Sequence, residues 1–554
     1  MLGRRGLRRG LRLAAEPLRP LARLRAKAPQ RLLIAPQDIR TVDPTIASEI
    51  EDGYYAFGGK IVNAGAASPF EIEAPSKSWA RALGGFGWLK HLRAADTQAS
   101  RALARALVAH FLQLRGRPVA DHPMWEPRVV SRRILAFLSQ SPMILEGAEP
   151  DFYRRFMSHF ARARAHLMRA LTEEAQGEWR LFAAIALAEL AVCSDADQRT
   201  QRAATQLLAR ELSRQLMADG GHIGRNPQTL VDLLLELLPL RQAYAARGTQ
   251  MPAALLNAID RMMPMLRLLR HGDGTLALFN GMSVTQPELI ATLLTYDDVR
   301  GRALLNAPYS GYQRIEARGS ALIAETGRPP PPAYSSEAHA GCLSFEFSVH
   351  GERLIVNCGA PGPNRAAARE IARTSAAHST LIVDDTSSCR FSSTAGLDRF
   401  FQGQILSGPT RVEVARSNTQ DGERLALSHD GYASRFGFVH ARALTLAPDG
   451  SRLFGEDSLL RTQQPGTAVA HRFALRFHLH PSVDAASIWD GQGVVLDLPS
   501  GQRFTFDADG REVALEDSIF FAAPNGPRQS RQIVIDGGIE GDVTIAWALA
   551  RVAE

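Results

Sequence analysis

Apolar residues recur at intervals of three and four from about residue 76 to about residue 302, which is the period of an amphipathic helix. Leu103, Leu107, Phe111 and Leu114 form one such stripe. Short breaker phrases separate the helical stretches, namely GAEPD (147–151), SDAD (194–197), DGGHIGRNP (219–227) and ARGTQMP (246–252). The pattern predicts an array of roughly ten antiparallel helices.

After Ala307 the apolar period changes to two, and Gly, Asp and Pro separate short runs typical of β-strands. The run LSFEFSV, for example, turns at HGER into LIVNCG. These runs predict antiparallel strands in two packed sheets rather than a βαβ fold. We therefore expect an N-terminal arm (1–31), a helical domain (32–306) and an antiparallel β-sandwich domain (307–554).

The net charge of +7 is concentrated in the arm. Residues 1–31 contain ten Lys/Arg and one acid, and the rest of the chain contains 54 Lys/Arg and 56 acids. The arm lacks the apolar core of a secretory signal, and its Gly and Pro residues weaken a helix. We expect a disordered arm, residues ahead of the true start, or an amphipathic segment in peripheral contact with an anionic membrane. No recognition motif accompanies the arginines, so nucleic acid is not an expected partner.

No stretch approaches the roughly 20 apolar residues of a membrane-spanning helix. The four cysteines are scattered without CxxC spacing, which favours buried free thiols over a zinc knuckle or a disulfide framework. The lack of a visible signal sequence and the free thiols predict a cytoplasmic protein.

Two phrases in the second half carry a family resemblance. HAGCLSFEFSVHGERLIVNCG resembles the HxHxDxLSFxL…G…LLVDxG phrase of heparinase II/III-like polysaccharide lyases, and TSAAHSTLIVDD resembles their xxHNTLxVDG. The resemblance implies an incomplete (α/α) toroid of antiparallel helix pairs followed by an antiparallel β-sandwich. It also implies β-elimination on an acidic, uronate-containing polysaccharide such as a glycosaminoglycan, in the bacterial envelope or periplasm.

β-Elimination needs a group that neutralises the uronate carboxylate, a base, and an acid for the leaving oxygen. In the family an Asn-His pair neutralises the carboxylate, and the corresponding phrase here contains Glu178 and Trp179. A carboxylate at that place would repel a uronate. The family tyrosine falls on Thr229 and Leu230, so this phenol is missing.

The remaining catalytic candidates belong to two loops. His222 and Arg225 could face a polyanion, although the same loop also fits a helix start capped by Asn226. Aligned on LSF, the base histidine of HxHxD becomes Glu337, and its aspartate becomes Gly341.

The resemblance places a metal-holding trio on His339, Asn357 and His378. Imidazole suits Zn²⁺ or another divalent metal, but an amide oxygen is a weaker ligand than the family's carboxylate. A simple hairpin would pair Asn357 near Glu346, so the trio needs a third strand to converge. The alternative is that the three residues cap and crosslink strands. No organic cofactor is expected, and His478 and His480 are interpreted as structural.

Two main functions remain open. The first is a polysaccharide lyase with a rearranged set of residues: His222 and Arg225 would bind the anionic sugar, and Glu337 or His378 would transfer protons. The second is a non-catalytic glycan-binding or cell-envelope assembly protein that kept the fold and lost the lyase residues. A third hypothesis is a cytoplasmic or membrane-surface partner protein whose arginine-rich arm docks on anionic lipid. A two-carboxylate hydrolase ranks below the lyase, because Glu178 alone does not make an acid pair.

Overall fold

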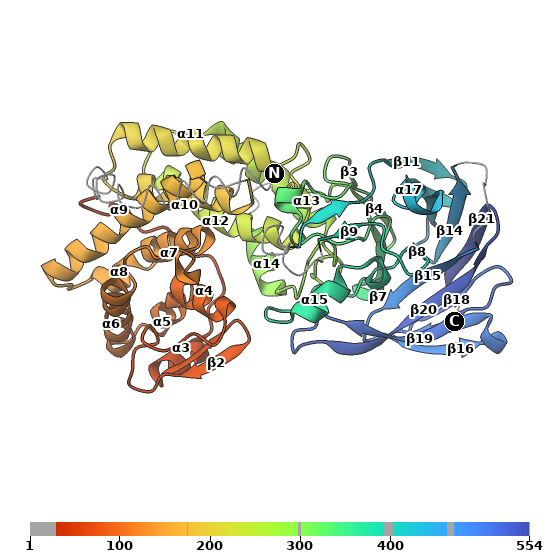
Figure 1. The fold of residues 1–554 in the computed structure, drawn as a ribbon, viewed down its shortest axis with the longest axis horizontal. Helices are drawn as coiled ribbons and strands as arrows, with labels where there is room; N and C mark the ends of the chain where they lie inside the picture. Colours follow the sequence, from red (N-terminus) through yellow and green to blue (C-terminus); the bar gives the residue numbers. More distant parts are fainter. Residues whose placement is uncertain (1–28, 174–175, 297–300, 393–402, 463–469, 553–554) are drawn as a thin grey trace. The chain divides into compact units, whose positions relative to one another are not determined.

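The computed structural model describes residues 29–173, 176–296, 301–392, 403–462 and 470–552. Helices dominate the chain up to Thr295, and antiparallel strands dominate it from Asn306 (Figure 1). The expected order of helices followed by antiparallel sheets is confirmed. The helices of the first part are α3 (Pro44–Glu51), α4 (Lys77–Gly85), α5 (Leu89–Ala95), α6 (Gln98–Leu114), α7 (Pro127–Ser139), α8 (Ser141–Leu145), α9 (Pro150–Glu173), α10 (Trp179–Cys193), α11 (Gln198–Gln215), α12 (Pro227–Ala246), α13 (Ala253–Leu268) and α14 (Pro287–Thr295).

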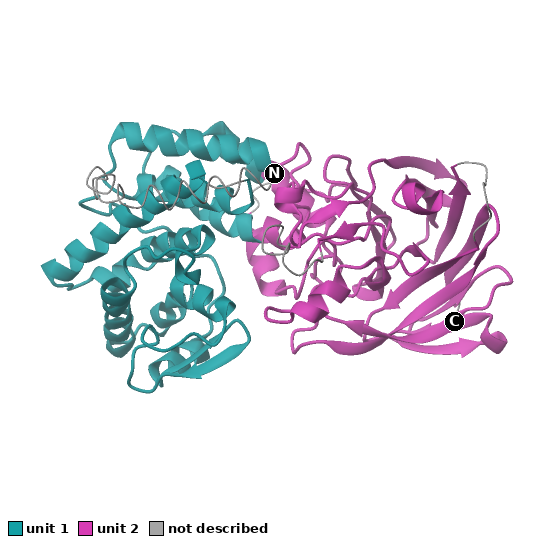
Figure 2. Cartoon of the chain, in the orientation of Figure 1, with its two compact units in different colours: residues 1–215, 232–259 teal, residues 216–231, 260–554 magenta. Residues whose placement is uncertain are grey.

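Figure 2 shows two compact units. The first contains the chain up to residue 215 together with residues 232–259, and the second contains residues 216–231 together with the chain from residue 260. The change from helix to strand between residues 295 and 306 therefore does not coincide with a boundary between units. The loop that carries His222 and Arg225 belongs to the second unit, with the strands.

The helices follow from capping and amphipathic spacing. Thr97 caps α6 by accepting a hydrogen bond from the backbone N–H of Ser100 at 3.0 Å. The buried face of α6 includes Leu107 and Phe111 from the predicted stripe, whereas Leu114 at its end is 44% exposed. Helix α10 is buried at every residue from Leu181 to Cys193, which makes it a core helix of the first unit. Among the described helices, none is long and apolar enough to cross a lipid bilayer.

Two large antiparallel sheets form most of the second unit. One has the order β11-β12-β13-β14-β21-β18-β17-β16, and the other β19-β20-β15-β7-β6-β5-β4-β3, with β8 paired to β15. The strands of the first sheet are β11 (Val412–Thr419), β12 (Gly422–His429), β13 (Phe438–Leu446), β14 (Arg452–Arg461), β16 (Asp484–Ile488), β17 (Gly493–Asp497), β18 (Arg503–Asp507) and β21 (Val543–Arg551). Those of the second are β3 (Asn306–Ala307), β4 (Tyr312–Ala317), β5 (Ser320–Glu325), β6 (Phe345–Val349), β7 (Glu352–Val356), β8 (Leu381–Val383), β15 (His471–Leu479), β19 (Ala514–Phe520) and β20 (Arg528–Ile539).

Smaller elements also occur in both units. A hairpin of β1 (Tyr54–Phe57) and β2 (Lys60–Asn63) lies in the first unit, and β9 (Arg390–Phe391) pairs with β10 (Ile405–Ser407) in the second. The second unit also contains the short helices α15 (Ala366–Ala372) and α17 (Ala433–Phe436).

The two large sheets share one apolar core. Phe345 of β6 stacks on Trp547 of β21 with ring centroids 5.8 Å apart, and Phe477 of β15 meets the same indole at 4.8 Å. The predicted hairpin of β6 and β7 is confirmed, and its turn residues His350 and Gly351 have φ of 47° and 87°. Positive φ at both central positions is typical of a tight hairpin turn. This core holds the loops of the candidate site in place.

Candidate functional site

His339 and His378 meet in the second unit although 39 positions separate them. Nδ1 of His339 lies 3.2 Å from Nε2 of His378, and the two buried rings meet edge to face. His339 lies in the loop before β6, where its backbone N–H donates to Oδ1 of Asn280 at 3.3 Å. His378 follows the short helix η4 (Ser375–Ala377). Two of the three predicted metal ligands are therefore in contact.

The hydrogen bonds of this pair define its proton positions. Nδ1 of His378 donates to the carbonyl oxygen of Thr374 at 2.7 Å, so we assign its Nε2 as the acceptor. Nδ1 of His339 then donates to that nitrogen, and Nε2 of His339 makes no hydrogen bond to a described residue. Burial lowers the pKa of His378 to about 4. Burial, followed by His378, lowers the pKa of His339 well below its ordinary value. Both rings are neutral at neutral pH.

Asn357, the third predicted ligand, has different partners. Its Oδ1 accepts from the backbone N–H of Ser379 at 2.9 Å, and its Nδ2 donates to Oε1 of Glu346 at 3.2 Å. The backbone N–H of Asn357 donates to the same carboxylate oxygen at 2.9 Å, and Oε2 of Glu346 lies 2.9 Å from Nε2 of His271. Asn357 therefore crosslinks β6, β7 and the start of β8 through Glu346.

The donor set does not fit a metal held by three ligands. Within the described ranges, no group of three or more His, Cys, Asp or Glu side chains is arranged to hold a metal ion. A Cβ added at Gly341, the aspartate position of the family phrase, would lie 2.7 Å from Cδ2 of His378 and 2.8 Å from Oε2 of Glu325. Because residue 341 is glycine, it supplies no carboxylate ligand to the two imidazoles, and an acidic side chain there would displace its neighbours.

The side chain of Arg225 is buried, and it bonds to residues of the second unit. Its Nε donates to the carbonyl oxygen of Ser310 at 2.7 Å, and its Nη1 lies 2.8 Å from Oε1 of the buried Glu325. Its guanidinium also lies over the ring of Tyr312, 5.1 Å from the centroid. Burial raises the pKa of Glu325 above its ordinary value, and Arg225 opposes that shift. This arginine holds the 219–227 loop against β4 and β5.

His222 and Glu337 differ in exposure. His222 is 3% exposed, and its Nδ1 accepts from the backbone N–H of Gly224 at 3.0 Å, so its ring braces the turn in which it lies. The side chain of Glu337 is 50% exposed and forms an ion pair with Arg369 of α15. The Glu337 carboxylate is therefore already engaged with a cation of its own chain.

Glu178 lies in the first unit, directly before α10. Its side chain is 45% exposed, and its Oε1 lies 3.6 Å from Nη1 of Arg128. The same arginine donates from Nη2 to Oδ2 of Asp232 at 2.9 Å. Glu178 therefore extends a charge network between α7 and α12.

The sequence analysis missed three residues around the histidine pair: Asn280, Tyr312 and Glu325. Tyr312 donates to the carbonyl oxygen of Arg225, and its hydroxyl accepts from Nδ2 of Asn280 at 3.0 Å. A carboxylate at the end of the fully buried strand β5, SALIAE, is the signal that could have revealed Glu325. Asn280 has a φ of 48°, and no pattern in the sequence predicts this left-handed backbone conformation.

Comparisons with known proteins agree with this fold. Residues 299–548 match the family described as Heparinase II/III-like, C-terminal. A heparan sulfate lyase of Pedobacter heparinus has a similar structure, with a TM-score of 0.63 at 15% identity over 98% of this chain and 89% of that one. A chondroitin AC lyase of Streptomyces coelicolor A3 gives a TM-score of 0.51 at 11% identity over 92% and 79% of the two chains. At these identities the likeness establishes the fold, an incomplete toroid followed by a β-sandwich.

The FtsZ-localized protein C of Caulobacter vibrioides is 32% identical over 533 residues, which cover 94% of this chain and 91% of that protein. The similarity therefore extends through both the helical part and the sheets. Together with the match over residues 299–548, it shows that this chain belongs to the heparinase II/III-like family as a divergent member.

Proposed function

We propose that this polysaccharide-lyase-like protein acts in cell-envelope assembly at the division machinery, as a non-cleaving member of its family. The similarity to the FtsZ-localized protein C over 94% of the chain is the observation that carries the proposal. A relative with this name, matched over both parts of the fold, favours a role tied to FtsZ over glycan degradation.

The candidate site supports the same conclusion. A lyase needs cationic or amide groups that reach the uronate carboxylate, and Arg225 is instead saturated by backbone carbonyls and Glu325. The carboxylate of Glu178 at the neutralising position adds repulsion. The base position carries Glu337 in an ion pair with Arg369. These contacts support a protein in which the positions that correspond to the family's neutralising pair and base histidine no longer serve β-elimination.

Two measurements test this proposal. Purified protein is mixed with heparan sulfate, chondroitin sulfate, hyaluronan and alginate, and the ultraviolet-absorbing unsaturated uronate is followed, with a Pedobacter heparinus heparan sulfate lyase as the positive control. We expect no product above the protein-free rate. A fluorescent fusion expressed in Caulobacter vibrioides is expected to co-localise with FtsZ. Turnover of any glycan, or a diffuse fusion, would contradict the proposal.

A second candidate is catalysis by the histidine pair on an acidic glycan. It is favoured by Nε2 of His339, which has a lone pair and no hydrogen bond to a described residue. Metal analysis of protein purified without chelator, with His339→Ala and His378→Ala as matched variants, separates the two candidates. A stoichiometric divalent metal that both variants lose, together with unsaturated product from the parent, would establish the lyase. A metal-free, inactive parent leaves the non-cleaving role.

The basic segment of residues 1–31 adds a membrane contact to the proposal. Residues 1–28 of this segment lie outside the described residues, so we infer the membrane contact from the sequence. Ten basic residues interleaved with leucines suit an anionic lipid surface, which a protein acting at the inner face of a dividing envelope would meet.

A further inference from the structure

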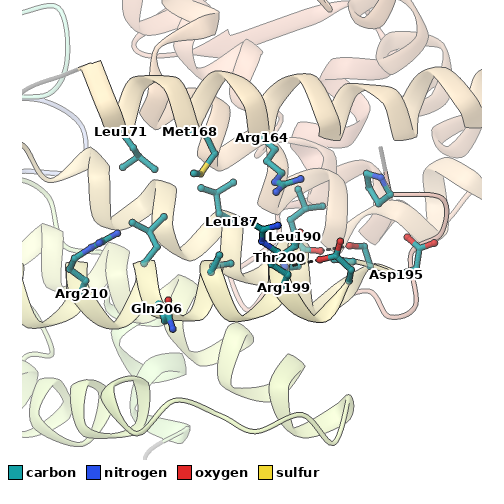
Figure 3. A pocket seen from close by; sticks show the side chains of 18 of the residues that line it. Arg164, Met168, Leu171, Leu187, Leu190, Asp195, Arg199, Thr200, Gln206 and Arg210 are labelled. Carbon is teal, nitrogen blue, oxygen red and sulfur yellow. Dashed lines mark hydrogen bonds between the residues drawn. The ribbon is translucent and has the colours of Figure 1, made fainter. Parts of the chain in front are cut away.

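A groove of about 750 Å³ opens in the first unit between α9, α10 and α11 (Figure 3). Its floor is apolar, because Leu187, Leu190 and Ala191 of α10 line it. Met168 and Leu171 of α9 form one wall, and Met168 is 45% exposed. None of the candidate site residues described above lines this groove.

The other wall is one face of α11. Thr200, Ala203, Ala204, Leu207 and Arg210 line the groove at the three- and four-residue spacing of a single helical face. From Asp197 to Arg210 this face runs for about 20 Å at 1.5 Å per residue. The two alanines in its middle leave room for close approach of another backbone. This wall of the groove is therefore as long as a helix of about 13 residues.

The rim of the groove carries more positive than negative charge. Arg164 of α9 and Arg199 and Arg210 of α11 line the groove, and none of them forms an ion pair within 4 Å among the described residues. Arg199 and Arg210 are exposed, and Arg164 is half-buried. An excess of arginines beside an apolar floor favours an occupant that supplies carboxylates.

The two acids in the lining already serve local structure. Oδ1 of Asp195 accepts from the backbone N–H of Gln30 at 2.9 Å, and Oδ1 of Asp197 accepts from the backbone N–H of Thr200 at 2.7 Å. Both lie at the end where α11 begins, and the lining near Arg210 contains no acid. They offset part of the arginine charge at one end only.

We propose that this groove binds an acidic amphipathic helix of a partner protein. The apolar face of that helix packs on Leu187 and Leu190, and its Asp or Glu side chains pair with Arg164, Arg199 and Arg210. This is the helix-in-groove mode, in which apolar residues at i, i+3, i+4 and i+7 give affinity and flanking charge gives specificity. The inference does not depend on whether the protein cleaves glycans.

The chain's own basic segment is the competing occupant. Residues 1–28 lead directly to Pro29 and Gln30, which line the groove, but they carry nine Lys/Arg and one Glu. Like charges across such a contact weaken binding, so a basic segment suits this rim poorly.

A displayed library of random 16-residue peptides, selected on the full chain and counter-selected on Ala203→Trp, tests the inference. Ala203 is exposed on the α11 face, so tryptophan there fills the groove without entering the core. We expect enriched peptides with net negative charge and apolar residues at helical spacing. Enrichment of basic peptides, or of none beyond the counter-selection, would overturn the proposal.

Synthetic copies of the most enriched peptide then measure the charge contribution. Arg199→Glu and Arg210→Glu should each weaken its Kd by about tenfold, as expected when an ion pair becomes a repulsion in a partly desolvated rim. Arg202→Glu is the matched control, because Arg202 is exposed on the same helix outside the groove. The affinity should also fall with added salt. Equal Kd values for all three variants would contradict the proposed site.

Discussion

Asp457 of β14 is a fully buried carboxylate that holds a cluster of charges in the sandwich core. It accepts hydrogen bonds from Nε2 of His440 at 2.7 Å, Nε of Arg442 at 2.7 Å and Nε1 of Trp547 at 2.9 Å. Arg442 in turn donates to the carbonyl oxygen of Leu343 at 2.7 Å, at the entry to the facing sheet. One carboxylate thus compensates a buried guanidinium that ties the two sheets together.

Asp457→Asn should destabilise the sandwich by about 3–5 kcal/mol, because it leaves the buried Arg442 without its counter-charge. Burial by itself would raise the pKa of Asp457, but Arg442 and His440 lower it from 3.8 to about 2. A lowered folded-state pKa means that this stabilisation is complete above about pH 4 and is lost as the pH falls toward 2. Urea midpoints measured from pH 7 to pH 2 should show this loss in the parent and not in the variant. Equal midpoints for both chains at pH 7 would contradict the assignment.

At the same scale, the sequence predicted contacts that depend on local register and missed those that depend on the tertiary fold. Hairpin geometry placed Asn357 beside Glu346, and the structure has a 2.9 Å hydrogen bond between the backbone N–H of Asn357 and that carboxylate. The contact of His339 with His378 followed only from the family resemblance. Glu325 was missed because its partner Arg225 is 100 positions away in the sequence, and only the fold of the second unit brings the two side chains together.

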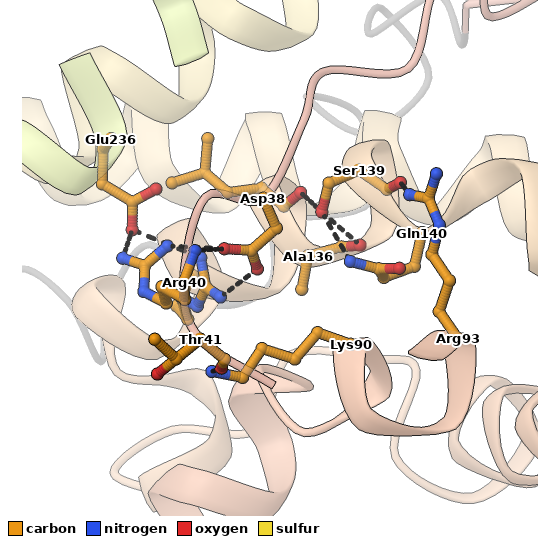
Figure 4. Close-up of polar contacts among 11 residues, drawn as sticks. Asp38, Arg40, Thr41, Lys90, Arg93, Ala136, Ser139, Gln140 and Glu236 are labelled. Atoms are coloured by element: carbon orange, nitrogen blue, oxygen red, sulfur yellow. Dashed lines mark hydrogen bonds and ion pairs between the residues drawn. The ribbon is translucent and has the colours of Figure 1, made fainter. Parts of the chain in front are cut away.

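At the scale of elements, α7 and α12 face each other through a charge network inside the first unit. Arg132 of α7 lies 3.3 Å from Oε1 of Glu236 of α12 and 2.9 Å from Oδ2 of Asp38 in the preceding segment. Arg40 bridges the same two acids, at 2.6 Å from Glu236 and 3.2 Å from Asp38 (Figure 4). The side chains of Asp38 and Glu236 are only 6% and 7% exposed. The network fastens residues 38–40 to both helices.

Glu236→Gln should destabilise the first unit by about 2–4 kcal/mol, because two largely buried arginines lose a shared counter-charge. The matched control is Glu126→Gln, which removes an ion pair with Arg81. The side chain of Arg81 is 46% exposed and that of Glu126 is 38% exposed. Such an exposed pair contributes about 0–1 kcal/mol. Chemical denaturation followed by far-ultraviolet circular dichroism compares the two variants. Equal losses would mean that burial does not decide the strength of these pairs.

A glycine of strand β14 makes room for the indole that packs between the two facing sheets. Gly455 is the register partner of Trp547 on β21, and a Cβ at residue 455 would lie 1.9 Å from Cζ2 of that indole. Gly455→Ala should therefore cost about 1–3 kcal/mol, since the indole must leave its stack on Phe345. Gly538→Ala on β20 is the control, because nothing lies within 4 Å of a Cβ there. A stable Gly455→Ala with unchanged near-ultraviolet circular dichroism would contradict this packing.

The hydrophobic period and the turn residues predicted most helices and strands, but they did not predict which unit a segment between helices belongs to. The change from a helical to a strand period was predicted between about residue 302 and residue 307, and in the structure the last helix ends at Thr295 and the first strand of the sheets begins at Asn306. No pattern in the sequence indicated that residues 216–231, which include the first turn of α12, belong with the strands. That segment has helical neighbours on both sides, and only its tertiary contacts, such as Arg225 with Ser310, assign it to the second unit.

For the whole molecule, charge is divided between the basic N-terminal segment and a nearly neutral remainder. Residues 1–31 hold ten of the 64 Lys/Arg and one of the 57 acids, so the rest of the chain carries two more acids than bases. Each Lys or Arg near an anionic bilayer contributes about 1 kcal/mol of attraction, and leucines between them add apolar insertion. Any electrostatic affinity for membranes should therefore reside in this segment.

Deletion of residues 1–28 should abolish sedimentation with vesicles that contain one-third phosphatidylglycerol, with at least about a tenfold loss in partition coefficient. The cut is placed there because Gln30 already bonds to Asp195, so the folded first unit stays intact. A full-length chain with its nine Lys/Arg in residues 1–28 changed to Gln is the matched control, and it should lose binding to the same extent if charge drives it. Binding of the parent should weaken as salt rises, because the Debye length shortens to about 3 Å at 1 M salt. If the truncated chain still sediments with these vesicles, the contact belongs to the folded units.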